Sequence, residues 1–243
     1  MVCMASLDTR IDEIGDGIFR LSTWVPDISE QGFTFNQFLL TCEQPFLFHT
    51  GMRKLFPLVS AAIARIIPLE KLRWISFGHL EADEFGSMNA FLEAAPHAEV
   101  IHGPLACALS LNDMCDRPPV AATDAPHDIG GHRLRFIPTP HVPHNWEAGL
   151  WFDETTSTLF AGDLFTRVGD GPALTELDLV EPAMEAEAMF QATGLNTNLV
   201  PTLERLANLN PTMLAIMHGS SYAGDGAAQL RTLSDAYSAM MTA

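Results

Sequence analysis

The sequence has few basic residues. Lys and Arg together number 13 against 30 Asp and Glu, which gives a formal net charge of −17. Nucleic-acid surfaces and proteins that dock on anionic membranes need clustered positive charge, so neither partner is expected. No apolar run reaches the length of a membrane span.

Cysteine is also scarce, and the sequence has no C-x-x-C pair. The spacing of the four cysteines does not indicate a disulfide framework, so we expect free thiols. The first ten residues lack the basic and apolar regions of a signal peptide, and a cytoplasmic location is therefore expected. The four are Cys3, Cys42, Cys107 and Cys115.

The 243 residues are 47% hydrophobic and 18% charged, a globular composition. With neither repeat nor linker, the simplest organisation is one domain over residues 1–243. A meander of strands is expected over residues 11–49, a helix over 52–67 and a strand over 72–77. Beyond these, strands and helices alternate. Residues 185–207 are expected to be largely helical, with Pro201 as a break or as the first turn of a second helix, and 226–241 form the last helix. This mixture predicts an α/β fold.

Ligand-type side chains gather after the strand at 74–77. His79, Glu81 and Asp83 stand at every second position, and Glu84 follows directly. Three carboxylates this close together repel one another unless a cation lies between them. The stretch therefore predicts a metal site on the turn between a strand and a helix.

Three more ligand candidates follow the ends of other expected strands: His141, Asp163 and His218. If those strands are neighbours in packed sheets, their following loops meet at one edge, where α/β folds place their chemistry. Three imidazoles with three or four carboxylates form an oxygen-rich donor set. Such a set suits iron or manganese better than structural zinc, which prefers Cys and His.

Taken together, H-x-E-x-D-x-x-G-S at 79–87, His-x-Pro at 141–143, Gly-Asp at 162–163 and His-Gly at 218–219 resemble the metallo-β-lactamase fold. More narrowly they resemble its diiron branch, the flavodiiron and oxygen-binding diiron proteins. The zinc hydrolases of the superfamily usually carry H-x-H-x-D-H, and Glu81 replaces the second His. The resemblance implies an αββα sandwich of two mixed β-sheets flanked by helices.

Residue by residue, the resemblance implies one iron bound by His79, Glu81 and His141. A second would be bound by Asp83 and His218, with Asp163 and an oxo, hydroxo or water bridge between the two. Manganese or zinc are the alternative metals.

Two positions depart from the family pattern. Glu84 stands where the family has a His, and it could ligate the second metal, point to solvent or leave a coordination position open. His49 stands where the wider fold often has Asp before Thr-Gly, and we expect it to support a ligand from behind. His144 and His102 are further candidates for the pocket wall. His97, His127 and His132 are expected to be solvated.

The function implied by the resemblance is a non-haem diiron protein that binds and reduces O2 or NO, or senses O2. A diiron oxidoreductase is favoured over a non-enzymatic sensor. The alternative is a dinuclear metal-dependent hydrolase of a lactone, thioester or phosphodiester. The chain ends at Ala243, so we expect no FMN domain in it, and electrons would come from a separate donor or the signal would pass to a partner protein. A homodimer is a further expectation.

Overall fold

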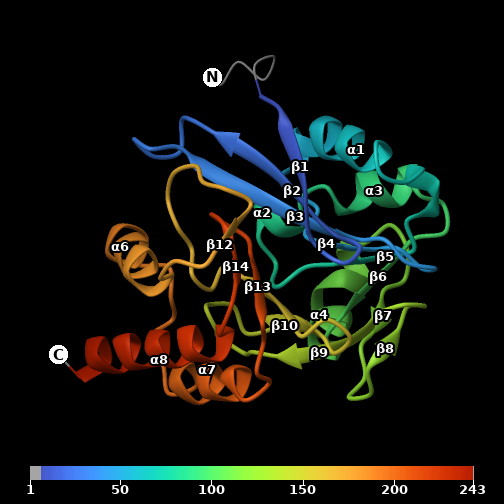
Figure 1. Cartoon of the computed structure of the whole chain (residues 1–243). Helices are drawn as coiled ribbons and strands as arrows, with labels where there is room; N and C mark the ends of the chain where they lie inside the picture. Colours follow the sequence, from blue (N-terminus) through green and yellow to red (C-terminus); the bar gives the residue numbers. More distant parts are fainter. Residues whose placement is uncertain (1–6, 243) are drawn as a thin grey trace.

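Two seven-stranded sheets pack face to face, with helices on both outer faces (Figure 1). This computed structural model describes residues 7–242, so Cys3 lies outside the described part. The expected αββα sandwich of two mixed sheets is confirmed. Cys42, Cys107 and Cys115 are free thiols.

The first sheet begins as an antiparallel meander and continues with parallel strands, in the order β1-β2-β3-β4-β5-β6-β7. Its strands are Thr9–Gly15, Ile18–Val25, Phe33–Leu40, Phe46–Phe48, Trp74–Ser76, Glu99–His102 and Val120–Ala121. The helices of this half are α1 (Phe56–Ala64), α2 (Ala82–Phe85), α3 (Met88–Ala94), α4 (Pro104–Ala106) and α5 (Asn112–Met114). Short 3-10 turns at Arg53–Leu55 and Leu69–Lys71 and a π turn at Cys107–Leu111 complete it.

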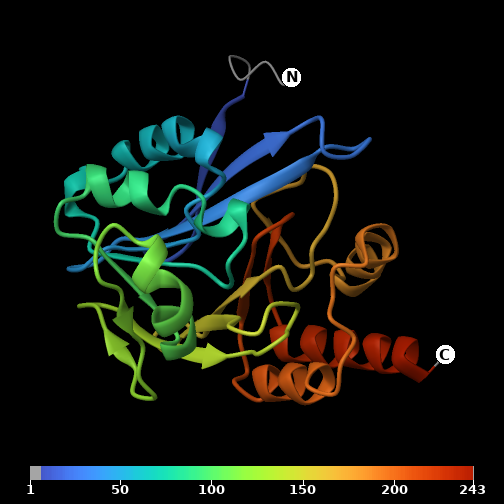
Figure 2. The same ribbon diagram turned by 180° about the vertical axis from the view of Figure 1, so that it is seen from behind.

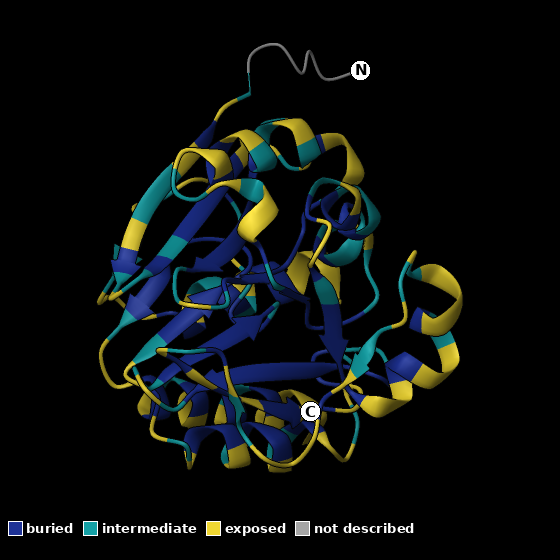
Figure 3. Cartoon of the chain, turned by 90° about the vertical axis from the view of Figure 1, so that its right-hand side faces the viewer, coloured by how far each residue is buried: buried dark blue, intermediate teal, exposed yellow. Residues whose placement is uncertain are grey.

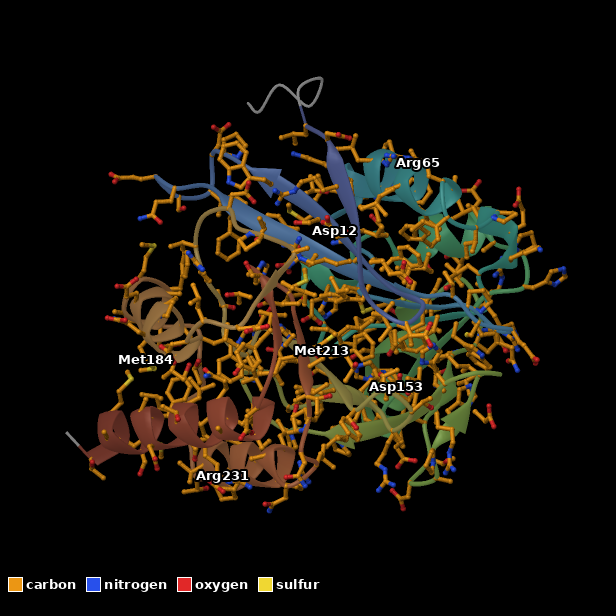
Figure 4. The ribbon with its side chains drawn as sticks, in the orientation of Figure 1. Asp12, Arg65, Asp153, Met184, Met213 and Arg231 are labelled. Carbon is orange, nitrogen blue, oxygen red and sulfur yellow. The ribbon has the colours of Figure 1, made fainter. Side chains whose placement is uncertain are left out.

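The second sheet has the order β12-β14-β13-β11-β10-β9-β8. Numbered from β8 to β14, its strands are His127–Asp128, Arg133–Pro138, Gly149–Asp153, Thr158–Gly162, Leu174–Thr175, Met213–Ile216 and Ser221–Ala223. Helices α6 (Val180–Phe190), α7 (Leu199–Ala207) and α8 (Gly226–Thr242) belong to this half. Met184 on α6 and Arg231 on α8 mark this helical side in Figure 4.

Apolar side chains form three layers, one under each helical face and one between the sheets. Figure 3 shows that the strands are largely buried, while the outward faces of the helices are exposed. The middle layer is rich in aromatic rings, and the indole N–H of Trp151 donates across the sheets to Ser76 Oγ at 2.8 Å. That bond secures the end of β5, where the first motif begins.

The helical segment expected over residues 185–207 is confirmed in part. It contains the end of α6, a loop over 191–198 and α7, and Pro201 lies in the first turn of this second helix, one of the two expected roles. Gln191 ends α6 in the left-handed region, at a φ of 50°, and in the first turn of α7 a missing N–H costs no hydrogen bond. The separation frees the loop to pack against the 141–144 segment: Gly194 N–H donates to Pro143 O at 2.6 Å.

Strand direction brings the candidate ligands to one edge. β11 is parallel to β13 and antiparallel to β10, which is antiparallel to β9, so β9, β11 and β13 end on the same side. The view from behind in Figure 2 shows the same two layers with their helices outside. In the described chain no helix is both long and apolar enough to cross a membrane.

Candidate metal centre

The first motif lies on the connection from β5 to α2. His79 is buried just beyond the strand, and Glu81 occupies the N-cap position of α2 with extended backbone angles. Asp83 and Glu84 then lie in the first helical turn. Successive helix positions point about 100° apart, so these two neighbouring carboxylates face different parts of the molecule.

Four side chains converge at this edge: those of His79, Glu81, His144 and Asp163. One ligand atom from each lies within 4.8 Å of the other three. His79 Nε2 is 3.5 Å from Glu81 Oε2 and 3.6 Å from Asp163 Oδ2. His144 Nε2 is 3.3 Å from Glu81 Oε1 and 3.9 Å from Asp163 Oδ2.

A second group shares Asp163. His218 Nε2 is 3.3 Å from the other oxygen of Asp163, Oδ1, and 3.4 Å from Asp83 Oδ2. The ring is oriented from behind, because its Nδ1 lies 2.8 Å from Thr34 O. A carbonyl can only accept, so Nδ1 keeps its proton, and Nε2 is the nitrogen that can lose its proton and bind a metal. Asp163 therefore lies between the two groups, one oxygen toward each.

These donors fit metal ions. His79 Nε2, His144 Nε2 and Asp163 Oδ1 are buried without a hydrogen-bond partner in residues 7–242. Ligand atoms about 2.1 Å from one ion lie roughly 3.0–3.4 Å apart, and the separations above begin at 3.3 Å. The first group could hold one ion with four donors, and the second could hold another with Asp83, His218 and Asp163.

Charge compensation in the metal-free centre is strong. Burial opposes protonation of His79, but the Glu84, Glu81 and Asp163 carboxylates outweigh it and raise its pKa to about 10. For His218 burial again opposes, and Asp163 and Asp83 raise its pKa to about 10. The His144 and His79 rings that face Glu81 lower its pKa to about 2. A metal ion at this centre replaces protons as the balancing charge.

His141 does not lie in the cluster. It is exposed, with a backbone φ of 62°, and its backbone carbonyl accepts a bond from Asn196 Nδ2 at 3.2 Å. The structure instead directs His144, three residues further on, between Glu81 and Asp163. The sequence expectation for these two histidines is therefore corrected: His144 takes the position that the resemblance gave to His141.

Glu84 points neither to solvent nor to the Asp83–His218 group. It is completely buried, and its Oε2 accepts the backbone N–H groups of Gly78 and His79 at 2.7 and 2.6 Å. Its Oε1 lies 3.3 Å from both His79 Nδ1 and His49 Nε2. His49 is thus adjacent to the site through Glu84, on the side of His79 away from the cluster.

His102 supports the same loop from beneath. It is buried, stacks on Phe77 at a centroid distance of 4.8 Å, and its Nε2 lies 3.3 Å from Gly78 O. Burial lowers its pKa to about 4, so the ring is neutral. It contacts the loop backbone and does not belong to the described pocket wall. His132 was expected to be solvated but is buried against Asp153, with Nδ1 2.7 Å from Oδ2.

Two contributors escaped the sequence analysis. Glu147 accepts a bond from Leu80 N at 3.0 Å and ties the His144 loop to the first motif. Thr34 orients His218 through its carbonyl and also accepts Gly219 N with Oγ1 at 2.8 Å. No local pattern marks either residue, because each acts through a partner distant in sequence.

A small pocket opens beside His144 and Asp163. Its wall comes largely from the β11–α6 connection and from α6, and it combines apolar side chains such as Phe165, Ala183 and Phe190 with polar ones such as Thr166 and Glu187. A small ligand could reach the metal-facing atoms through this pocket.

The chain is similar to known proteins in sequence and in fold. A diflavin flavoprotein A of Synechocystis sp. is 26% identical over 194 residues, covering 77% of this chain and 33% of that protein. The chain thus spans about a third of that curated relative's length.

Solved structures share the fold. A metal-soaked flavodiiron core from Synechocystis sp. superposes with a TM-score of 0.82 at 22% identity, covering 97% of this chain and 61% of the other. The rubredoxin oxygen:oxidoreductase of Desulfovibrio gigas gives 0.79 at 18% identity, covering 96% and 62%. The model of a family described as "ODP family beta lactamase" matches residues 33–219. Because that match spans most of the chain and every candidate ligand from His79 to His218, the chain belongs to the ODP beta-lactamase family and has the metallo-β-lactamase-like fold of flavodiiron cores.

Proposed function

We propose that this chain is a non-haem diiron protein that binds and reduces O2, or NO, with electrons from a separate donor. The observation that carries the proposal is Glu81. Its two oxygens face His79 and His144, at 3.5 and 3.3 Å, where a zinc hydrolase of this fold would present an imidazole. A third carboxylate in the centre favours a hard, redox-active ion.

The carboxylates, the histidines and the pocket residues of the chain have different roles in this proposal. Iron held here would supply O2 binding and one-electron transfer. Glu81, Asp83 and Asp163 supply negative oxygen donors that stabilise the oxidised metal, and Asp163 spans both positions. His79 and His218 can each lose the Nε2 proton and offer that nitrogen to a metal. Phe165 and Phe190 contribute apolar side chains to the pocket beside the centre.

The electron donor is inferred from chemistry. Reduction of O2 to water needs four electrons, more than two irons cycling between their ferrous and ferric states can give. The matched relative is a diflavin flavoprotein, and one structural neighbour is named for rubredoxin and oxygen. We therefore propose that a protein carrying a one-electron cofactor reduces this centre. A homodimer is also proposed.

Iron reconstitution tests the proposal. Purified chain is loaded anaerobically with Fe(II), reduced, and mixed with O2 in an oxygen electrode, with NO as the second substrate. We expect consumption that needs bound iron and falls to the background of free iron in Glu81→Ala, which empties the first metal position. Glu185→Gln, an exposed change on α6, is the control and retains activity.

The hydrolase alternative has its own outcome in the same experiment. Zinc-loaded chain is offered a panel of lactones, thioesters and phosphodiesters. Turnover that needs Glu81, together with no iron-dependent O2 or NO consumption, would replace the oxidoreductase proposal.

A further inference from the structure

Glu84 and His49 form a buried pair beneath His79. Neither side chain is exposed, and Glu84 Oε1 lies 3.3 Å from His49 Nε2 and 3.3 Å from His79 Nδ1. The backbone is fixed in the same place: Thr50 N–H and Oγ1–H both donate to Glu84 O, at 2.6 and 3.0 Å. The carboxylate is therefore part of a packed arrangement.

Movement of Glu84 toward Asp83 and His218 is opposed by its own bonds. Its Oε2 is the acceptor for two buried backbone N–H groups, those of Gly78 and His79. Leaving them without an acceptor is costly in the interior. Gly78 also makes room for the carboxylate, since a Cβ there would lie 3.1 Å from each of its oxygens.

The contact with His79 has a chemical consequence. A carboxylate oxygen facing Nδ1 at 3.3 Å favours a proton on that nitrogen, so the proton on Nε2 is the one lost when a metal binds. His218 follows the same plan with the carbonyl of Thr34 as the acceptor. The Glu84 carboxylate thus faces Nδ1 of His79, as the Thr34 carbonyl faces Nδ1 of His218.

We propose that Glu84 is a positioning residue for His79 and not a metal ligand, so that the centre is asymmetric and its first position fills before its second. This inference rests on the proposed metal centre. The first position has four protein donors, from His79, Glu81, His144 and Asp163. The second has three in the described structure, from Asp83, His218 and the other oxygen of Asp163.

Metal titration of the chelator-treated protein tests the proposal. Mn(II) is added in equal steps and free Mn(II) is followed by its electron paramagnetic resonance signal. We expect two binding steps, with the first at least tenfold tighter than the second. Two steps of equal affinity in the wild type would overturn the asymmetry.

Glu84→Gln separates positioning from ligation. The amide keeps the volume but presents an N–H donor to His79 Nδ1, which favours the tautomer with its proton on Nε2, the atom facing the metal. In serine proteases, replacing the Asp beside the catalytic His by Asn leaves that His in the wrong tautomer in the same way. We expect the first step to weaken at least tenfold and the second, measured by its own constant, to change less. Loss confined to the second step would show that Glu84 is a ligand.

Two matched variants complete the test. Asp83→Asn removes a donor of the second position and should weaken that step alone, while Glu93→Gln, exposed on α3, should change neither. Imidazole ¹⁵N spectra of the metal-free protein, recorded above the pKa of about 10 where the His79 ring holds one proton, give a readout without metal: Glu84→Gln should move that proton from Nδ1 to Nε2, and an unchanged spectrum would overturn the positioning role. If the wild type bound no metal, the proposed function would fall, and these spectra would still decide the role of Glu84.

Discussion

Replacing Glu84 with Ala should destabilise the metal-free protein strongly. The change removes the acceptor of Gly78 N–H and His79 N–H, which are bonded at 2.7 and 2.6 Å in a fully buried site. Each buried N–H left without an acceptor costs about 1–3 kcal/mol. The two together lower the free energy of unfolding by about 4 kcal/mol, or about 8–16 °C in Tm for a chain of this size.

Thermal unfolding followed by circular dichroism in the presence of a chelator measures this loss. Burial opposes ionisation of Glu84, but the nearby His79 and His49 outweigh it and lower its pKa. A carboxylate with a lowered pKa in the folded state stabilises the folded protein at pH values above its unfolded pKa. That stabilisation is lost as the pH falls through the folded pKa. The gap between wild type and Glu84→Ala should therefore narrow in acid.

His49 provides the second arm of the experiment. Because it contacts Glu84 at 3.3 Å, the His49→Ala and Glu84→Ala effects should not add, and the double variant should show a coupling of about 0.5–3 kcal/mol. Glu93→Ala, on the exposed side of α3, should stay within about 0.5 kcal/mol of wild type. A Glu84→Ala protein that melts with the wild type would refute the buried position of this carboxylate.

Three further predictions follow from other contacts. Asp163→Asn should reduce metal content at both positions, because one oxygen faces each group; elemental analysis after dialysis that shows one position fully retained would contradict the shared role. Since the carboxylates raise the pKa of His79 and His218 to about 10, both rings hold protons at neutral pH, so metal binding should release protons and tighten as pH rises toward that value. Calorimetry in two buffers of different ionisation enthalpy detects the release, and equal heats would refute it. His132→Ala should lower the free energy of unfolding by about 1–3 kcal/mol near neutral pH by removing the partner of buried Asp153. Burial opposes ionisation of Asp153, but its hydrogen bonds, the largest effect being that of His132, lower its pKa. The stabilisation from this lowered pKa is lost as pH falls through the folded pKa. In urea titrations, the difference in unfolding free energy between wild type and His132→Ala should therefore shrink in acid.

The sandwich was predictable because its signals are local. Alternating apolar strands and the helical period over 52–67 correspond to β1 to β5 and α1. The candidate ligands also follow strand ends, as expected, since ligands at the ends of parallel strands share an edge. The resemblance then supplied the sheet arrangement, which no local pattern fixes.

The assignments that depend on distant partners were not predictable in the same way. His141 and His144 share one proline-rich loop, and the sequence offers no means to decide which ring turns inward. The loop is set by Glu147 bonding to Leu80 and by Gly194 bonding to Pro143, contacts made across the fold. The 191–198 loop precedes Pro201, which the sequence marks as a break or as the first turn of a second helix, and its Gly194, Asn196 and Asn198 are poor helix formers.

Glu84 shows the limit for a single position. Glu84 follows Asp83 directly, at a position where the family has a ligand. The sequence left three orientations open and placed Glu84 among the candidate ligands of the second metal. The short helix α2 turns it away from Asp83, and the buried N–H groups beneath His79 give it an acceptor's role.

Oxygen uptake by the iron-loaded chain tests the central proposal most directly. Anaerobically reduced protein, freed of unbound iron, is mixed with excess O2 and a one-electron reductant, beside a zinc-loaded sample of the same preparation. The account predicts sustained uptake in proportion to bound iron and none with zinc. Uptake by the iron-loaded chain no greater than that of the zinc-loaded chain would contradict it.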